Sequence, residues 1–221
     1  MPDNKYCYSN SDVLINKFGI TDSNDLFILE KTVAITRLCE LQETPIKGKF
    51  DFSHLKAIHK YLFQDVYEWA GKERTVDIGK GNLFCRPAFI QKFAASIFSK
   101  YFPQCYAAKD NHKEFVKVFA ENYGDLNALH PFREGNGRAQ REFARMVCLK
   151  CGYDFILSYT THQEMLNASK LSFDKGDNTL FIKIFSEAVI QHDSEERQDF
   201  SELSILISDD LTIFPETEAH T

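Results

Sequence analysis

The 221-residue sequence predicts a soluble, mainly α-helical protein with one core, and each part of this prediction depends on one observation. Apolar residues recur at the helical spacing through most of the chain. No unbroken apolar run reaches the roughly 18 residues that a membrane-spanning helix needs. The length and the 43% hydrophobic composition allow one sizeable core but not two full-size domains joined by a linker. We therefore expect one helical domain with an appendage.

Seven segments fit the helical period best, and the second shows the pattern most clearly. In residues 52–66, Leu55, Ile58 and Leu62 fall at positions i, i+3 and i+7, which places them on one buried face. Ser53 is the predicted N-cap of this helix. The predicted helical segments are residues 22–42, 52–66, 87–102, 111–128, 137–151, 161–172 and 178–191.

Residues 73–86 depart from the helical pattern. Residues 75–78 favour a β-strand, the GKGN tetrapeptide after them supplies turn residues, and residues 83–85 can return as a second strand. A short β-hairpin is therefore expected here.

Acidic residues are concentrated at the C-terminal end. Residues 192–221 hold nine acids against one arginine, a net charge of −8, which leaves +2 for residues 1–191 of a chain whose formal net charge is −6. A nearly neutral body suits an anionic small ligand, whereas broad binding of nucleic acid usually needs a strongly basic face. We expect residues 1–191 to form one domain and residues 192–221 to be an acidic tail that begins a further module. Neither nucleic acid nor a membrane is expected as a partner.

The N-terminal sequence and the cysteines indicate in which cellular compartment the protein is made and whether its thiols are reduced. The first residues, MPDNKYCYSNSD, lack the basic patch and apolar stretch of a secretory signal peptide. Cys148 and Cys151 form a CxxC pair without a second pair at zinc spacing, so core packing is favoured over metal binding. Reduced thiols are expected for all six cysteines, since a chain of this length does not need disulfide bonds for its stability. They are Cys7, Cys39, Cys85, Cys105, Cys148 and Cys151.

The densest chemical signal is the segment ALHPFREGNGRAQREFARM, where an apolar helix end leads into a polar loop and a second helix begins directly after it. The unpaired N–H groups and the dipole of a helix start favour a bound phosphate. Gly135 and Gly137 let the backbone approach a ligand closely, and Asn136 can cap the helix or contact the ligand. Arg138 and Arg141 share a face of the first turn, where two guanidinium groups can hold further phosphate oxygens. A di- or triphosphate is therefore the predicted ligand.

A base and a metal ligand flank this loop. Polyphosphate normally travels with Mg²⁺, and Glu134 offers the hard oxygen ligand that this ion prefers. His130 precedes the loop, and a histidine is the natural base for an attacking hydroxyl near neutral pH. Phe132 lies between polar residues and is interpreted as an anchor that inserts into the core. Three other histidines are interpreted as structural: His54, His59 and His112.

These motif residues resemble those of the Fic family, whose pattern is HxFx(D/E)GNGRxxR. The resemblance covers roughly residues 10–190 and includes LFQDVYEWAGKERTVDIGKG and FCRPAFI, which are similar to the region leading into the family's flap. It implies a helical Fic fold with a short β-hairpin flap at about residues 73–86, near an active site at residues 130–141. Every fixed position is matched: His130, Phe132, Glu134, Gly135, Asn136, Gly137, Arg138 and Arg141.

The resemblance implies a protein adenylyltransferase that moves AMP from ATP to a Ser, Thr or Tyr hydroxyl of a target protein and releases pyrophosphate. By this analogy His130 activates the hydroxyl, Glu134 holds Mg²⁺, and the backbone of residues 135–137 forms the anion hole. Asn136 and Arg138 would orient phosphates while Arg141 engages the terminal one; charge neutralisation and positioning are the usual physics of such transfers. The family's kinase-like branch has a lysine in place of Gly137, so AMP transfer is favoured over phosphorylation.

In this family the flap holds an extended target segment by strand addition and borders the adenine site. The resemblance therefore makes five residues of the hairpin candidates for binding the nucleotide or the target. They are Asp77, Ile78, Lys80, Gly81 and Asn82.

Many Fic proteins also carry an inhibitory helix with the pattern (S/T)xxxE(G/N). Only Glu121 and Glu134 are followed by Asn or Gly, and the residues four positions earlier, Lys117 and His130, do not fit. This resembles the class whose inhibitor is a separate small antitoxin, which would supply a glutamate to Arg141.

The flap region is most similar to the Fic domains of Bartonella effectors delivered by type IV secretion. That likeness implies a protein of the bacterial cytoplasm that is translocated into the cytosol of a host cell, with the host protein as a possible target. Two alternatives stay open: transfer of another nucleotide or phosphate-bearing group, and a non-catalytic nucleotide-binding interaction module.

Overall fold

The computed structural model describes residues 5–80, 82–158 and 160–192, and it confirms the prediction of a mainly α-helical fold. The helices are α1 (Ser23–Glu43), α2 (Phe52–Phe63), α3 (Ile90–Phe98), α4 (Tyr101–Ala108), α5 (His112–Leu129), α6 (Asn136–Lys150), α7 (His162–Lys175) and α8 (Thr179–Ala188), with a 3₁₀ turn, η1 (Pro87–Phe89). The strands are β1 (Gly79–Lys80), β2 (Asn82–Leu83), β3 (Tyr153–Phe155) and β4 (Val189–Gln191).

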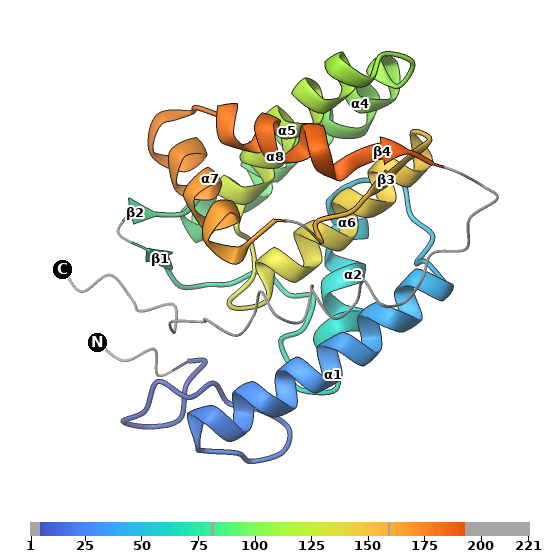
Figure 1. Cartoon of the computed structure of the whole chain (residues 1–221). Helices are drawn as coiled ribbons and strands as arrows, with labels where there is room; N and C mark the ends of the chain where they lie inside the picture. The colour runs from blue at the N-terminus through green and yellow to red at the C-terminus, as the bar shows by residue number, and fades with distance from the viewer. Residues whose placement is uncertain (1–4, 81, 159, 193–221) are drawn as a thin grey trace.

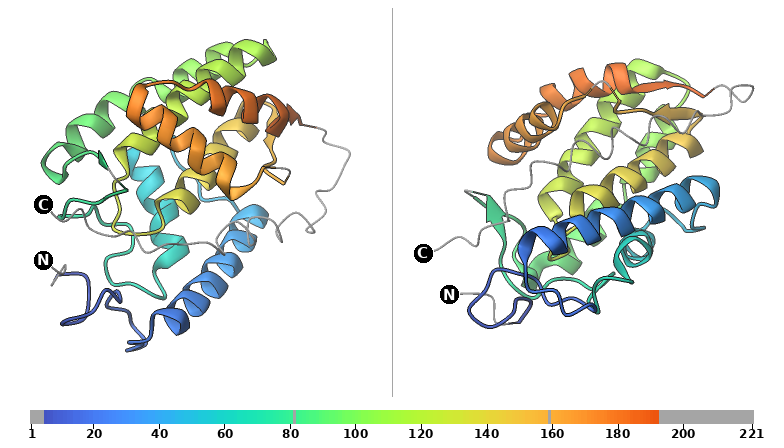
Figure 2. Two further views of the ribbon diagram at one scale, coloured as in Figure 1. Left: turned by 60° about the vertical axis from the view of Figure 1, so that its left-hand side comes forward. Right: turned by 60° about the horizontal axis from the view of Figure 1, so that its bottom comes forward.

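Helix α6 lies at the centre of this arrangement (Figure 1). It packs against α2 on one side and against α5 on another, while α1 covers α2 and both α7 and α8 cover α5. Figure 2 shows these helices as successive layers, with α1 at one outer face and α7 and α8 at the opposite one. The α5–α6 connection, which holds the motif, is thereby enclosed between layers contributed by distant parts of the chain.

Two small antiparallel sheets complete the described part of the fold, and both differ in detail from the sequence prediction. In the predicted hairpin, strand β1 begins at Gly79 rather than within residues 75–78, and it pairs with β2 so that Gly79 lies opposite Leu83. The predicted helix 178–191 ends at Ala188, because Val189 is buried and residues 189–191 pair with β3. Strand β3 was not predicted from the sequence.

The predicted helix 87–102 is divided into three parts. A 3₁₀ turn precedes α3, which ends at Phe98, and α4 then begins at Tyr101 and continues to Ala108. The break before α4 places Pro103 in the first turn of a new helix, where its missing N–H would have no intrahelical partner. In a continuous helix the same proline would remove an internal hydrogen bond.

The predicted N-cap of α2 was wrong by two positions. Asp51 is the N-cap, and its side chain accepts a hydrogen bond from the backbone N–H of His54 at 2.9 Å. The Ser53 hydroxyl donates to Asp51 Oδ1 at 2.6 Å and so supports the cap without being it. The carboxylate lies one residue before the helix, where capping side chains act.

The sequence predictions about the cysteines and about membrane-spanning helices can also be compared with the structure. Cys148 and Cys151 are both buried within the core, as core packing predicted, and the described cysteines are free thiols. Among the described residues, no helix combines the length and the apolar character that crossing a bilayer requires. The predicted acidic tail, apart from residue 192, lies outside the described residues, as does Gly81 of the flap.

Candidate active site

The loop between α5 and α6 begins and ends on residues in the left-handed backbone region. His130 caps the C-terminus of α5 with φ 41°, and Gly135 caps the N-terminus of α6 with φ 76°. Because Pro131 disfavours a helical conformation at the residue before it, α5 ends where the motif begins. The sequence thus places the histidine at the very point where the chain turns.

The Asn136 side chain closes the loop through hydrogen bonds to Phe132, and it does not cap α6. Its Nδ2 donates to the Phe132 carbonyl, and its Oδ1 accepts from the Phe132 N–H, both at 2.8 Å. Asn136 is the first residue of α6 and is buried, so the predicted capping role passes to Gly135, which has no side chain. Asn136 still lines the cleft described below.

Phe132 anchors this loop against α2. Its ring is fully buried and stacks on the His59 ring with centroids 3.8 Å apart. His59 Nε2 donates to the Glu134 carbonyl and its Nδ1 accepts from the Gly71 N–H, both at 2.9 Å. One ring nitrogen must donate and the other accept, so this imidazole is neutral, and burial lowers the pKa of His59 to about 3.

The other histidines interpreted as structural also make hydrogen bonds to backbone carbonyls. His54 is buried and its Nε2 lies 2.8 Å from the Ile46 carbonyl, while His112 Nε2 lies 2.7 Å from the Val189 carbonyl. These contacts hold α2 to the preceding loop and α5 to strand β4.

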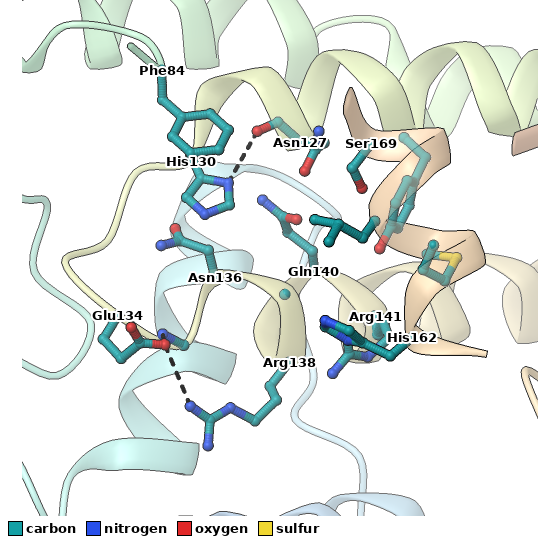
Figure 3. A pocket seen from close by; sticks show the side chains of 15 residues that line it. Phe84, Asn127, His130, Glu134, Asn136, Arg138, Gln140, Arg141, His162 and Ser169 are labelled. Atoms are coloured by element: carbon teal, nitrogen blue, oxygen red, sulfur yellow. Dashed lines mark hydrogen bonds and ion pairs between the residues drawn. The ribbon is translucent and has the colours of Figure 1, made fainter. Parts of the chain in front are cut away.

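The His130 ring is oriented by contacts on two sides (Figure 3). Its Nδ1 lies 3.1 Å from the Asn127 carbonyl, and since a carbonyl can only accept, Nδ1 carries the proton. Phe84 stacks on the ring face with centroids 3.8 Å apart and an interplanar angle of 8°. When the ring is neutral, this contact leaves Nε2 as the basic atom, which is the arrangement that a general base needs.

A cleft of about 890 Å³, counting the space open to solvent, lies beside this histidine. One wall is formed by the motif loop and the first turns of α6, where His130, Glu134 and Arg141 all contribute. The opposite wall is α7, and the end of the flap contributes Phe84 (Figure 3). The cleft therefore unites seven of the predicted site residues: His130, Glu134, Gly135, Asn136, Gly137, Arg138 and Arg141.

The described candidate residues of the flap, unlike most of those of the motif, are not found in the lining of the cleft. Of the described flap residues, Phe84 lines the cleft, whereas Asp77 and Ile78 do not, and Ile78 is instead buried. Lys80 and Asn82 lie in the paired strands β1 and β2, and Gly81 is outside the described residues. The hairpin thus reaches the cleft through a residue that the sequence interpretation did not select.

Several other lining residues were missed as well. Asn127 is three residues before His130 and could have been found from the helical period of α5. The residues on α7 carry no comparable sequence signal, because only the fold brings that helix opposite the motif. They are His162, Met165, Leu166 and Ser169.

The two motif arginines, Arg138 and Arg141, differ in the contacts that their guanidinium groups make. Arg138 Nη2 lies 2.5 Å from Glu30 Oε1 and 3.6 Å from Glu134 Oε1, and its guanidinium lies over the Phe63 ring at 4.6 Å. Arg141 and His162 both line the cleft (Figure 3). The charge of Arg138 is thus partly compensated by carboxylates within the protein.

The Arg138 partner on α1 is itself held by another buried side chain. The Tyr67 hydroxyl donates to Glu30 Oε2 in a short hydrogen bond, and both residues are buried. Burial, first, and the nearby carboxylate of Glu30 raise the pKa of Tyr67 well above its usual range. A tyrosine that stays protonated remains a donor to Glu30 at all physiological pH values.

Glu134 has the position and the chemistry that a magnesium ligand needs. Its carboxylate lines the cleft, retains 19% side-chain exposure, and accepts a hydrogen bond from the Gly135 N–H at 2.7 Å. Mg²⁺ is typically bound through one or two protein carboxylates, with phosphate oxygens and water as its other ligands. The described residues contain no cluster of three or more His, Cys, Asp or Glu side chains that could hold a metal ion.

Together, the helical layers and the cleft define a site at a helix N-terminus that is lined by a histidine, a carboxylate and two arginines. Residues 49–148 match the family model described as Fic/DOC family. The chain is 38% identical over 198 residues to a protein adenylyltransferase of Bartonella schoenbuchensis, covering 89% of this chain and 41% of that protein. It is also 38% identical over 169 residues to a probable protein adenylyltransferase of Sinorhizobium fredii, covering 76% of this chain and 86% of the relative. This chain belongs to the Fic/DOC family.

A solved structure agrees with this assignment. The N-terminal Fic domain of a putative cell filamentation protein from Bartonella quintana, a VirB-translocated effector with bound ADP, superposes with a TM-score of 0.81 at 26% identity. The match covers 88% of this chain and 98% of that one. By contrast, the chain spans only about two fifths of the Bartonella schoenbuchensis relative.

Proposed function

We propose that this chain is a protein adenylyltransferase, which transfers AMP from ATP to a Ser, Thr or Tyr hydroxyl of a target protein. The observation that carries the proposal is the placement of His130, with Nδ1 held by the Asn127 carbonyl, beside a helix N-terminus lined by Glu134 and Arg141. Relatives named protein adenylyltransferase and a neighbouring structure with bound ADP support it.

In the proposed reaction, His130 Nε2 takes the proton from the target hydroxyl as its oxygen attacks the α-phosphorus. The new oxygen–phosphorus bond forms while the bond from the α-phosphorus to the bridging oxygen breaks, and pyrophosphate leaves. The start of α6 would stabilise the negative charge through its N–H groups and dipole. Arg141 would bind the terminal phosphate, and Arg138 and Asn136 would orient the phosphates. These two residues would also maintain the shape of the phosphate cradle, which is the motif loop together with the first turn of α6.

Glu134 would hold Mg²⁺ together with the nucleotide phosphates. When bound, the ion would neutralise negative charge on the nucleotide phosphates. The apolar side chains of α7, Met165 and Leu166, face the cradle across the cleft and are suited to contact the base of the nucleotide.

The flap is the proposed docking place for the target segment. Strands β1 and β2 form a two-stranded sheet, and a target chain adding to its edge would lie near His130. Under this proposal the hairpin candidates Asp77, Ile78, Lys80, Gly81 and Asn82 serve target binding more than nucleotide binding.

The test is incubation with α-labelled ATP, Mg²⁺ and a bacterial or host lysate. The wild type should label a protein band and the His130→Ala variant should not, whereas His112→Ala, which changes a histidine away from the cleft, should keep the label. Label retained by His130→Ala would contradict the role of the base. Competition with GTP, UTP and CDP-choline distinguishes AMP transfer from transfer of another group, and nucleotide binding without labelling would favour an interaction module.

Regulation and setting belong to the same proposal. A small antitoxin could place a glutamate against Arg141 and block the terminal phosphate position, which co-purification from the native host would reveal. The likeness to VirB-translocated effectors supports synthesis in the bacterial cytoplasm and delivery into a host cell. We further propose that residues 1–191 are the catalytic domain and that residues 192–221 begin another module.

A further inference from the structure

Arg74 connects the two ends of the flap to the loop that follows α5. It is buried, and its Nε donates to the His130 carbonyl at 2.9 Å. Its Nη1 donates to the Val76 carbonyl at 2.8 Å and its Nη2 donates to the Cys85 carbonyl in a short hydrogen bond. A guanidinium is planar and rigid, so these three acceptors are held at fixed positions relative to one another.

The backbone reinforces the same connection. The Arg74 N–H donates to the Pro131 carbonyl at 2.9 Å, and the Cys85 N–H donates to the Ala128 carbonyl at 3.2 Å. The residues on both sides of His130 are therefore tied to the residues that enter and leave the hairpin.

Phe84 extends this connection from the backbone to the imidazole ring. Its N–H donates to the Ile78 carbonyl at 3.1 Å, next to the paired strands β1 and β2. Its ring is stacked on the His130 ring and also contacts Phe173 of α7, with centroids 5.1 Å apart. Figure 3 shows Phe84 covering the ring face while the Asn127 carbonyl holds Nδ1. Rotation of the imidazole would therefore break a stacking contact and a hydrogen bond together.

His130 needs such support because its backbone has φ 41°, a region that non-glycine residues occupy only when their surroundings determine it. Arg74, which holds the His130 carbonyl, and Phe84, which packs on the His130 ring, belong to the flap segment rather than to the motif.

We propose that Arg74 and Phe84 are positioning residues that couple the flap to the base: the flap sets the orientation of His130, so a target segment docked on the hairpin meets an imidazole already held in its reactive tautomer. This inference rests on the proposed adenylyltransferase function. It adds two residues outside the motif to those that control the transfer step, and both act through His130.

The test compares Phe84→Leu with Phe84→Tyr, with Arg74→Lys as an independent variant. Phe84→Leu keeps an apolar side chain but loses the flat face, so we expect turnover on a lysate with saturating α-labelled ATP to fall at least about tenfold, whereas Phe84→Tyr should rescue it. The affinity for ADP, measured by calorimetry, should change less than about twofold, because the phosphate cradle is not altered. Phe89→Leu is the matched control, since Phe89 lies outside the cleft with 58% of its surface exposed.

A second readout does not depend on the reaction. In the ligand-free protein, ¹⁵N chemical shifts of the His130 ring should report one neutral tautomer for the wild type and a mixture for Phe84→Leu and Arg74→Lys. An unchanged tautomer together with turnover within twofold of wild type would overturn the proposal. If the wild type itself transfers nothing, the adenylyltransferase assignment fails, while the ring shifts still decide whether the flap positions His130.

Discussion

At the scale of single residues, the motif depends on partners that are far from it in sequence. Glu30 of α1 approaches Arg138 at 2.5 Å, and both side chains are almost fully buried. Tyr67 supplies a hydrogen bond to the other oxygen of the same carboxylate. A buried charge without a partner is costly, so this pair is coupled more tightly than an exposed one.

We expect Glu30→Ala to lower the free energy of unfolding by about 3–5 kcal/mol, because it leaves the Arg138 guanidinium buried without its main partner. The double variant Glu30→Ala with Arg138→Ala should cost less than the sum of the single changes, by about 0.5–3 kcal/mol. Urea unfolding of the four proteins measures both quantities.

The control for this cycle is Glu68→Ala, which removes the exposed partner of Lys17 and should cost at most about 1 kcal/mol. A Glu30→Ala effect as small as that of Glu68→Ala would show that the buried pair does not contribute as described.

The sequence selected the residues of the cleft better than it selected their partners. The spacing around His130 was enough to select a histidine, a carboxylate and two arginines that the structure brings to one cleft. Glu30, Arg74 and Phe84 were not selected, because their importance arises from contacts across 108, 56 and 46 positions of the chain, respectively. No local pattern records a contact of that range.

At the scale of elements, the α5–α6 connection requires a glycine at Gly135 for two reasons. Its φ of 76° disfavours side chains, and a Cβ at this position would lie 2.3 Å from Phe63 Cζ. Phe63 is buried and carries the Arg138 guanidinium over its ring, so it cannot move aside without disturbing the cradle. The loop can therefore pass close to α2 only at a residue without a side chain.

Substitution of Gly135 by alanine should therefore lower the free energy of unfolding by more than the same substitution does at an ordinary glycine with a left-handed backbone. Gly176→Ala is the matched comparison, because Gly176 has φ 65° and a Cβ there would meet nothing within 4 Å, and the left-handed backbone alone costs roughly 1–2 kcal/mol. We expect Gly135→Ala to lose at least twice as much unfolding free energy and to weaken ADP binding, while Gly176→Ala leaves binding unchanged. Thermal unfolding and calorimetry provide the two measurements, and equal losses in both variants would contradict the close contact with Phe63.

Element boundaries show where local patterns reach their limit. Residues 75–78 favour a strand by composition, but Arg74 binds the Val76 carbonyl, and pairing begins only at Gly79. The end of α8 likewise follows from pairing of Val189 with Phe155 rather than from the helical period of the sequence. In both places a tertiary contact decided between two local conformations that the sequence allowed.

At the scale of the whole molecule, aromatic side chains pack helix α8, in an outer layer, against helix α5, which ends at His130. Phe185 of α8 is fully buried and has ring centroids 5.2 Å from each of Phe119, Tyr123 and Phe155. Phe119 and Tyr123 lie on α5, the helix that ends at His130. The mainly α architecture could be predicted from apolar periodicity, but this assignment of aromatic neighbours could not, because periodicity gives the buried face of a helix and not its partner.

Truncation of this aromatic cluster should separate global stability from the chemistry of the cleft. We expect Phe185→Ala to lower the unfolding free energy by about 3–5 kcal/mol, as other large-to-small core changes do. Leu180→Ala on the same helix, where Leu180 is 36% exposed, should stay within about 0.5 kcal/mol of wild type. Below its unfolding midpoint, Phe185→Ala should bind ADP as the wild type does, because neither Phe185 nor α8 lines the cleft among the described residues. Weakened ADP binding by the folded variant would show instead that α8 sets the position of α5 and that the cradle is sensitive to packing two layers away.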